Sequence, residues 1–576
     1  MEYTMNYNEN YERWLTSDKV DDATKKELAA IAGNDEEIKL RFIKSLEFGT
    51  AGLRGTMMAG TNAMNIYTVA QATQGLADLI NQLGKADRGV AIAYDSRNNS
   101  ELYAKTAASV LAANGIIAHI FDSLRPTPVL SFAVRELRTI AGINITASHN
   151  PKQYNGYKAY WEDGAQLPPD HAATVSKSIA EADIFDDVKT TDFDKAVADG
   201  IIKYIPASVD EAYIENVIAE AVNPGIIRQV ADSLEIVYTP LHGAGYKMVP
   251  EVLRRVGLKH IDVVDEQMVL DGNFPTVAYP NPEVLEIFEL GIKLAEKVHS
   301  DLIIATDPDS DRVGIMSRDK SGKFVRLTGN QVGALLLDYI ITAYEEKGMP
   351  ENPYAIKTIV TTDMVTKICS DHNIKLHNVL TGFKFIGEVI KQYEKTGHDN
   401  YIFGFEESYG YLKGTYARDK DAVVASMLLC EMAAYYSTKD MTLCDAMQGL
   451  YDRYGYYDEG VANIYMDGLD GIERMKKLMN DLRETPPTEL AGRRIIERRD
   501  YLNDTVLDVD TGKITSTGLP SSNVLYYVTE CGDVIVIRPS GTEPKIKIYI
   551  LAHDESLEAV RKKIDEYKKV TDTWVD

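Results

Sequence analysis

The sequence predicts an α/β protein of about four domains, three of them related to one another. At 576 residues the chain is too long for one hydrophobic core, and one domain per ~150 residues gives about four. Three segments repeat the order strand, polar loop, amphipathic helix, Gly or Asn, strand. The last stretch follows a different pattern, which indicates a separate, smaller α+β domain.

The three repeats are marked by the residue that follows each helix. Gly115, Gly257 and Asn373 stand where a helix closes in the left-handed conformation, which Gly and Asn adopt readily. A strand-helix-strand unit sets its two strands parallel, with a right-handed crossover. We therefore expect three α/β domains with mixed sheets between helices. The repeats run from Gly89 to Phe121, from Leu234 to Val264 and from Thr358 to Leu380.

The C-terminal stretch reads as short strands followed by one helix. Strands are expected at 525–529, 533–537 and 546–551, and the helix at 555–569. Domain boundaries are expected near residues 205, 327 and 457. The four domains would then span 1–205, 206–327, 328–457 and 458–576.

Composition and charge argue against several classes of protein. The hydrophobic (45%) and charged (26%) contents are ordinary for a globular chain. A net charge of −25 opposes nucleic-acid or anionic-membrane partners, so an anionic substrate would need local cations. No apolar stretch reaches the ~20 residues that span a bilayer, and residues 1–14 hold no apolar signal region. Four cysteines without a C-x-x-C pair favour a reducing cytoplasm.

An acidic motif, Asp307-Pro308-Asp309-Ser310-Asp311-Arg312, follows the apolar strand 302–305. Carboxylates at alternate positions after a strand can converge on one hard cation. Two ionised groups ~4 Å apart repel by about 4 kcal/mol at an effective dielectric of about 20, so three together favour a divalent ion. The motif lacks the Gly and Glu of an EF-hand. A solvated acidic turn is the alternative.

A second motif, Thr146-Ala147-Ser148-His149-Asn150-Pro151, also follows an apolar strand. Strand-end loops are where α/β folds place their sites. The Gly-x-Ser-x-Gly elbow of a serine hydrolase occurs nowhere in the chain, so we interpret Ser148 as a phosphoryl carrier and not as an acyl nucleophile. The alternative is that Ser148 and Asn150 only cap a turn or helix.

A third motif, Arg538-Pro539-Ser540-Gly541-Thr542-Glu543-Pro544-Lys545, lies between two expected strands. Its prolines restrict the loop, Gly541 permits positive φ, and the other polar residues supply hydrogen-bond donors. Such a nest of donors suits a phosphate dianion. An ordinary hairpin connection is the alternative.

A fourth motif, Gly404-Phe405-Glu406-Glu407-Ser408, places two carboxylates at a loop tip. Carboxylates accept hydrogen bonds from sugar hydroxyls, so this pair could bind a hexose, with a surface acidic pair as the alternative. The chain has no Walker loop, no complete G-x-G-x-x-G and no H-E-x-x-H. Nucleotide-driven transfer, dinucleotide redox chemistry and zinc proteolysis therefore lack their usual signatures.

In order, these loops resemble those of the α-D-phosphohexomutase superfamily, and within it the phosphoglucomutase branch that includes the phosphoglucomutase and phosphopentomutase type 2 enzymes. The series begins with Phe48-Gly49-Thr50-Ala51-Gly52-Leu53-Arg54-Gly55 and covers nearly the whole chain. The resemblance implies three domains of shared topology and a C-terminal domain similar to the TATA-binding-protein fold. It also implies an isomerase that moves a phosphoryl group on a phosphosugar.

The same resemblance implies roles for individual residues. Ser148 would be phosphorylated and would complete a Mg²⁺ site with Asp307, Asp309 and Asp311. Arg54, His149 and Lys158 would surround the transferring phosphate, with Lys158 or His149 as the proton acceptor. Glu406 and Ser408 would hold the 3- and 4-hydroxyls of the sugar. The remaining expected substrate contacts are Arg312, Thr381, Lys384, Lys420, Arg538, Ser540, Gly541, Thr542 and Lys545.

The implied reaction interconverts glucose 1-phosphate and glucose 6-phosphate through a phosphoserine and glucose 1,6-bisphosphate, which would also act as activator. Alternatives with the same chemistry are a phosphomannomutase, a phosphopentomutase or a glucose-1,6-bisphosphate synthase. An alternative of another class is a catalytically silent phosphosugar-binding protein. The sequence indicates no oligomeric state.

Overall fold

The computed structural model describes residues 6–49, 52–466, 471–540 and 545–575. The chain forms two compact units, each described by itself below. The first contains residues 1–327, 387–392 and 410–439, and the second contains residues 328–386, 393–409 and 440–576. Within the described ranges, every helix is too short or too polar to cross a membrane.

Three helices open the first unit, each with an Asn or Asp side chain capping its N-terminus. Their apolar faces form a small core in which the rings of Trp14 and Phe42 lie 5.7 Å apart. Phe185 joins this core, so the helices are anchored to a segment far along the chain. They are α1 (Tyr7–Thr16), α2 (Asp22–Ala29) and α3 (Asp35–Phe42).

The first repeat lies in a six-stranded mixed sheet of order β1-β5-β4-β2-β3-β6. β2 pairs in parallel with β3 and β4, whereas β5 is antiparallel to β1 and β4. The strands are β1 (Gly52–Thr56), β2 (Val90–Tyr94), β3 (Ala118–Ile120), β4 (Ala141–Ile145), β5 (Tyr154–Trp161) and β6 (Ile202–Tyr204). The helices are α4 (Ile66–Gln82), η1 (Ala86–Arg88), α5 (Ser100–Ala113), α6 (Thr127–Glu136), α7 (Pro169–Glu181), α8 (Phe193–Ala198) and α9 (Ala207–Ala219).

The second repeat lies in a five-stranded sheet of order β11-β10-β9-β7-β8, again mixed. Helix α17 (Ala422–Ser437), from much later in the chain, packs against α11 in the same unit. The strands are β7 (Glu235–Thr239), β8 (His260–Val263), β9 (Leu302–Thr306), β10 (Val313–Arg318) and β11 (Phe324–Leu327). The helices are α10 (Ile226–Gln229), α11 (Gly245–Arg255), α12 (Asp265–Met268), η2 (Leu285–Phe288) and α13 (Glu289–Val298).

The third repeat opens the second unit with three parallel strands in the order β13-β12-β14. Our expectation that its first strand begins at Thr358 is wrong, because β12 spans Pro353–Thr358 and residues 359–361 form a turn. The apolar pair Ile359 and Val360 extends the strand pattern, but both side chains are buried against the C-terminal sheet. The other elements of this domain are β13 (Lys375–Val379), β14 (Asn400–Glu406), α14 (Gly329–Lys347), α15 (Met364–Asp371), α16 (Phe383–Thr396) and α18 (Leu443–Tyr454). Strand β15 (Gly410–Leu412) and residues 387–392 of α16 belong to the first unit.

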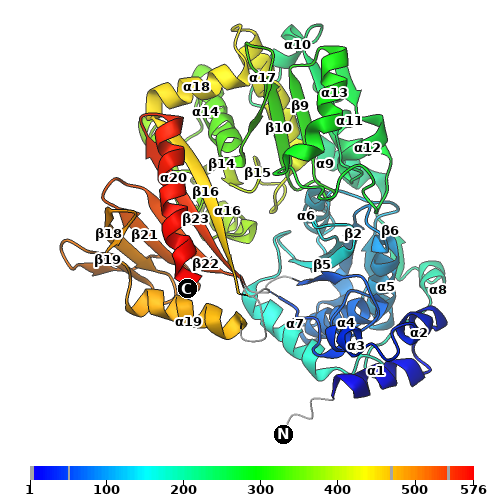
Figure 1. Cartoon of the computed structure of the whole chain (residues 1–576). Helices are drawn as coiled ribbons and strands as arrows, with labels where there is room; N and C mark the ends of the chain where they lie inside the picture. Colours follow the sequence, from blue (N-terminus) through cyan, green and yellow to red (C-terminus); the bar gives the residue numbers. More distant parts are fainter. Residues whose placement is uncertain (1–5, 50–51, 467–470, 541–544, 576) are drawn as a thin grey trace. The chain divides into compact units, whose positions relative to one another are not determined.

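The C-terminal domain is an antiparallel sheet of order β16-β23-β22-β21-β18-β19-β20, with β17 beside β18. Helix α20 lies across β16 and β23 (Figure 1). Alternation along β22 sends Ile535 and Ile537 toward the helices and Val534 and Val536 toward the turn after β12. The elements are β16 (Tyr456–Tyr465), β17 (Glu489–Leu490), β18 (Arg493–Asp500), β19 (Thr505–Asp508), β20 (Ile514–Thr515), β21 (Leu525–Thr529), β22 (Val534–Pro539), β23 (Lys545–Asp554), α19 (Gly471–Glu484), α20 (Leu557–Asp572) and η3 (Thr573–Val575).

These sheets confirm the predicted fold class. In each α/β domain the two strands of the sequence repeat pair in parallel, as β2 with β3, β7 with β8 and β12 with β13. The residues expected to close the repeat helices have positive φ: 74° at Gly115, 108° at Gly257 and 54° at Asn373. The C-terminal strands and helix follow in the expected order.

Candidate active site

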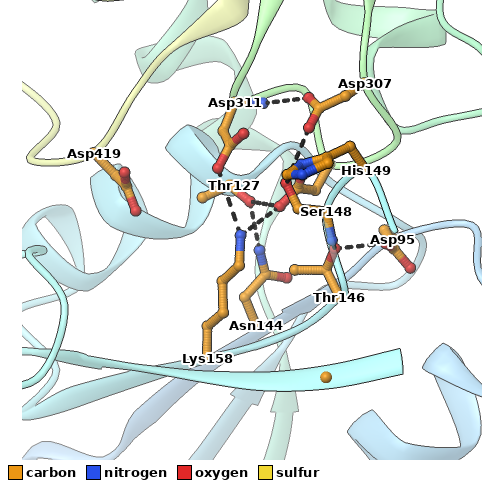
Figure 2. Close-up of polar contacts among 12 residues, drawn as sticks. Asp95, Thr127, Asn144, Thr146, Ser148, His149, Lys158, Asp307, Asp311 and Asp419 are labelled. Carbon is orange, nitrogen blue, oxygen red and sulfur yellow. Dashed lines mark hydrogen bonds and ion pairs between the residues drawn. The ribbon is translucent and has the colours of Figure 1, made fainter. Parts of the chain in front are cut away.

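Ser148 lies in the loop that follows β4 and is almost fully buried. Its φ of 53° is unusual for a residue other than glycine, and such strain often accompanies a functional side chain. The backbone N–H of Ser148 donates to Thr146 Oγ1 over 2.8 Å (Figure 2). Thr146 Oγ1 in turn donates to Asp95 Oδ2 over 2.6 Å. The local hydrogen bonds therefore hold the serine in this conformation.

A buried ion pair between Asp95 and Arg97 holds the serine loop in place. Arg97 Nε lies 3.2 Å from Asp95 Oδ2, and neither side chain is exposed. The guanidinium of Arg97 also donates to the backbone carbonyls of Ser148, Asn150 and Pro151. One cation thus fixes three carbonyl groups of the loop that carries the serine.

The three aspartates of the acidic motif come together beside this serine. They follow β9, and Asp307, Asp309 and Asp311 each offer a carboxylate oxygen within 4.8 Å of the others. Ser148 Oγ donates to Asp307 Oδ2 over 3.0 Å. Asp307 Oδ1 accepts the backbone N–H groups of Asp311 (3.1 Å) and Arg312 (3.0 Å).

Gly243 allows the loop after β7 to pack closely against the acidic loop. A Cβ on Gly243 would lie 2.4 Å from Cα of Pro308, so no other residue fits there without movement. The next residue, Ala244, donates its backbone N–H to the carbonyl of Pro308 over 2.8 Å. The loop after β7 therefore fixes the turn between the first two aspartates.

Asp309 is held by groups from strand β5 and from the start of helix α6. Its Oδ2 accepts hydrogen bonds from Lys158 Nζ (2.7 Å) and Thr127 Oγ1 (2.9 Å). Asn144 Nδ2 donates to Thr127 Oγ1 over 2.7 Å. Our sequence reasoning missed Thr127 and Asn144. The signal for Asn144 was available, since it is the one amide in the otherwise apolar strand β4.

The carboxyl groups differ in how readily they ionise. Burial, and after it the charges of Asp309 and Asp311, raise the pKa of Asp307 well above its usual value. Burial also opposes ionisation of Asp309, but the ammonium of Lys158 outweighs it and lowers the pKa of Asp309. Full ionisation of the cluster thus depends on positive charge brought close to it.

The donor set fits a hard divalent cation. Asp309 Oδ1 and Asp311 Oδ1 are fully buried, and neither has a hydrogen-bond partner among the described residues. Leaving two such oxygens unsatisfied is costly unless a ligand completes them. Carboxylate oxygens are the ligands that Mg²⁺ and Ca²⁺ prefer. The residues present therefore fit the metal site that the sequence predicts.

Two further polar groups of the motifs lie at this site. His149 Nδ1 is 3.4 Å from Ser148 Oγ, and burial, followed by the charges of Arg312 and Arg54, lowers the pKa of His149 well below its usual value. Burial opposes the charge of Lys158, but Asp309 and Asp311 raise its pKa overall. The imidazole is therefore neutral at pH 7, whereas the lysine is an ammonium.

Three other expected residues of the first unit line the same region. Arg54 Nη1 donates to Asn150 Oδ1, in the serine loop, over 2.9 Å. Lys420 Nζ lies 3.2 Å from Asp311 Oδ2 and 3.1 Å from Asp419 Oδ1. Arg312 Nη1 donates to Glu283 Oε1 over 3.0 Å. These cations offset part of the charge of the aspartates.

The expected sugar-binding loops lie in the second unit. Glu406 ends β14, is buried, and accepts the backbone N–H of Gly382 on its Oε1 over 2.8 Å. This bond joins the Glu406 loop to the loop of Thr381 and Lys384. Thr381 and Ser408 are half-buried, and Lys384 Nζ lies 5.0 Å from the centroid of the Phe385 ring.

The expected phosphate loop connects β22 to β23, also in the second unit. The backbone N–H of Ser540 donates to the carbonyl of Lys545 over 2.7 Å and closes the loop. Arg538 is half-buried, and Lys545 Nζ lies 5.4 Å from the centroid of the Tyr465 ring. Gly541 and Thr542 lie outside the described residues.

Comparison with known proteins accounts for this arrangement. Sequence models of four domains described as phosphoglucomutase/phosphomannomutase match the chain in order: alpha/beta/alpha domain I over residues 45–184, domain II over 211–322, domain III over 328–454 and the C-terminal domain over 489–566. The chain belongs to the phosphoglucomutase/phosphomannomutase family. It is therefore an isomerase of the phosphohexomutase type, and the predicted superfamily is confirmed. The alternative of a catalytically silent binding protein is set aside.

Relatives of known name lie in the same family. A phosphoglucomutase of Staphylococcus aureus strain MRSA252 is 37% identical over 539 residues, covering 92% of this chain and 94% of the relative. The phosphoglucomutase of strain USA300 is 36% identical over the same share. Members of this phosphoglucomutase/phosphomannomutase family thus align with the chain almost end to end.

Solved structures of the family share the fold. The open form of the Paramecium phosphoglucomutase pp63/parafusin superposes with a TM-score of 0.68 at 17% identity, covering 92% of this chain and 96% of that one. A phosphoglucomutase/phosphomannomutase family protein from Burkholderia thailandensis superposes with a TM-score of 0.64 at 18% identity, covering 92% and 97%.

Proposed function

We propose that this isomerase is a phosphoglucomutase that interconverts glucose 1-phosphate and glucose 6-phosphate, with Ser148 as the phosphoryl carrier. The observation that carries the proposal is the hydrogen bond from Ser148 Oγ to Asp307 Oδ2, within a cluster of three buried aspartates. The S. aureus relatives named phosphoglucomutase support glucose as the sugar.

In the proposed reaction the phosphoryl group leaves Ser148 for a sugar hydroxyl. The bond between phosphorus and Ser148 Oγ breaks as the bond to the sugar oxygen forms, and the hydroxyl proton passes to a base. His149 suits that role because its ring lies beside Ser148 Oγ, whereas Lys158 is engaged with two carboxylates. The product of this step is glucose 1,6-bisphosphate. After reorientation, its other phosphate returns to Ser148.

The charged groups stabilise the phosphoryl oxygens during transfer. Asp307, Asp309, Asp311 and an oxygen on Ser148 would hold Mg²⁺, which would neutralise negative charge on the phosphoryl group. Lys158 and Arg54 bring positive charge from the protein itself. The buried ion pair of Asp95 and Arg97 keeps the serine loop in place, so that little reorganisation is needed during the reaction.

Loops of the second unit are proposed to bind the rest of the substrate. Glu406 would accept hydrogen bonds from the 3- and 4-hydroxyls of the sugar, and Ser408 would accept or donate them, in both orientations of the bisphosphate. The distal phosphate would bind the loop between β22 and β23. The proposed contacts from the second unit are Thr381, Lys384, Arg538, Ser540, Gly541, Thr542 and Lys545. Arg312 and Lys420, from the first unit, are the other proposed contacts.

A substrate panel tests the proposal. The kcat/KM values of the 1-phosphates of glucose, mannose, ribose and deoxyribose would be compared, with Mg²⁺ and glucose 1,6-bisphosphate present. We expect glucose 1-phosphate to be preferred by at least roughly tenfold. A preference for mannose or a pentose would overturn the choice of substrate but not the carrier mechanism, whereas full activity of Ser148→Ala would overturn the mechanism.

A further inference from the structure

A cavity lined by both charged and apolar side chains lies within the second unit, away from the residues assigned above. Its volume is about 380 Å³, which is in the range of small-molecule sites. The turn after β12 and helix α15 form one wall, and the C-terminal sheet forms the other. The residues that bear on the argument are Lys357, Asp363, Lys367, Tyr457, Arg499 and Tyr526.

The charged residues of this cavity are mostly cations. Three cations, Lys357, Lys367 and Arg499, line it, and Asp363 is the one carboxylate among the described lining residues. Lys357 Nζ lies 2.6 Å from Asp363 Oδ1, so these two neutralise each other. Arg499 is likewise paired with Glu497, whose Oε1 lies 2.7 Å from both Nε and Nη2 of the guanidinium. Lys367 therefore supplies the surplus positive charge, and Arg499 adds further N–H donors. Such a gathering of cations stands out in a chain with a net charge of −25.

Aromatic rings hold both cations at the cavity wall. Lys367 Nζ lies 5.4 Å from the centroid of the Tyr457 ring, and Arg499 Cζ lies 4.4 Å from that of Tyr526. The ring of His553 stacks on that of Tyr457, with 5.3 Å between their centroids. The side chains of Ile359, Val528 and Val534 add apolar surface. The cavity therefore combines two ordered cations with an apolar lining.

This cavity is separate from the loops proposed to bind substrate. It reaches β22 at Val534, four residues before Arg538, and a strand rises ~3.3 Å per residue, so the phosphate loop lies about 13 Å away along the strand. Lys357 pairs with Phe405 in the parallel sheet, so their side chains share one face. Glu406 is the next residue along the strand, so its side chain lies on the opposite face.

We propose that this cavity is a second binding site, for a small organic phosphate monoester. A phosphate monoester carries a charge of about −1.5 to −2 at pH 7, which would attract the ammonium of Lys367 and accept hydrogen bonds from the guanidinium of Arg499. Its organic part would contact the apolar residues of the lining. Because the cavity lies where the turn after β12 meets the C-terminal sheet, an occupant would also hold these two parts of the second unit together.

Calorimetric titration of the full chain with phenyl phosphate tests the site. We expect a binding event, separate from any at the proposed active site, that weakens roughly fivefold in Lys367→Ala and in Arg499→Ala and is restored in Lys367→Arg. Lys477→Ala, which removes an exposed lysine elsewhere in the second unit, and Arg538→Ala should leave the affinity unchanged. Lys367 is exposed on α15, so its loss should not affect folding, which the melting temperature of each variant checks.

Other outcomes would overturn the proposal. Absence of binding, or equal affinity in the wild-type chain and the Lys367 and Arg499 variants, would remove the site. Loss of binding in Arg538→Ala alone would assign the probe to the phosphate loop. Inorganic phosphate that binds as tightly as phenyl phosphate would show a site for free phosphate and not for an ester, and phenol that binds equally well would show that the charge is irrelevant.

Discussion

Ser148 Oγ donates a 3.0 Å hydrogen bond to Asp307 Oδ2, although 159 residues separate them in the sequence. The contact joins the loop after β4 of the first sheet to the loop after β9 of the second, inside one compact unit. This contact, between a serine held in strained backbone and a buried acidic cluster, is the basis on which we propose a phosphoryl carrier beside a cation site.

Removing one charge from the acidic cluster should weaken metal binding. Asp309→Asn keeps the size of the side chain but removes a hard charged ligand, and we expect Mg²⁺ affinity to fall roughly tenfold or more. Calorimetric titration with Mg²⁺ measures this. Asp301→Asn is the matched control, since Asp301 is exposed just before the same strand and should bind no metal. Equal Mg²⁺ affinity in Asp309→Asn and the unaltered chain would exclude Asp309 from the metal site.

Breaking the buried ion pair beneath the serine loop should reduce stability. Arg97→Met leaves the Asp95 carboxylate buried without its partner, at an expected cost of about 3 kcal/mol in the free energy of unfolding. It should also lower kcat by at least roughly tenfold, because three loop carbonyls lose their donor. Urea unfolding and steady-state kinetics measure the two effects.

A double variant separates the ion pair from simple loss of packing. Asp95→Asn combined with Arg97→Met should regain part of the stability, since no buried charge is then unpaired. Arg88→Met, at a partly exposed pair with Glu162, should cost at most about 1 kcal/mol. If Arg97→Met were no more destabilising than Arg88→Met, the pair would not support the loop as we argue.

Stability should depend on pH through Glu459 in β16. Burial raises the pKa of Glu459 to about 7, whereas its ordinary value is 4.5, so folding favours the protonated form. The stabilisation is complete below pH 4.5 and is lost as pH rises through 7. In urea unfolding, Glu459→Gln should therefore raise the free energy of unfolding by roughly 2 kcal/mol at pH 8 and change it little at pH 5. The exposed Glu489→Gln is the control, and an equal effect of both variants at pH 8 would rule out this origin.

The sequence was sufficient for the repeats and for the position of each motif. Gly115, Gly257 and Asn373 marked where helices end, because few residue types adopt positive φ, and apolar runs marked the strands that precede Ser148 and Asp307. These are local signals. They place polar groups at strand ends, where the topology of an α/β sheet brings distant loops together.

Contacts between distant segments could not be predicted in the same way. Thr127 reaches Asp309 across 182 residues, and nothing local to either residue indicates the pair. The pairing of β16 with β23 joins segments that begin at Tyr456 and Lys545. The wrong start of the strand near Thr358 has the same cause. Ile359 and Val360 are apolar because they pack against the C-terminal sheet, and they do not lie in a strand.

Peptide mapping by mass spectrometry tests the central claim most directly. The full chain would be incubated with Mg²⁺ and glucose 1,6-bisphosphate, digested and analysed for phosphorylated peptides, with Ser148→Ala and the exposed Ser321→Ala in parallel. We expect one phosphoryl group on Ser148, kept in Ser321→Ala, and neither phosphoryl group nor turnover in the folded Ser148→Ala. A fully active chain in which Ser148 never carries phosphate would contradict the account.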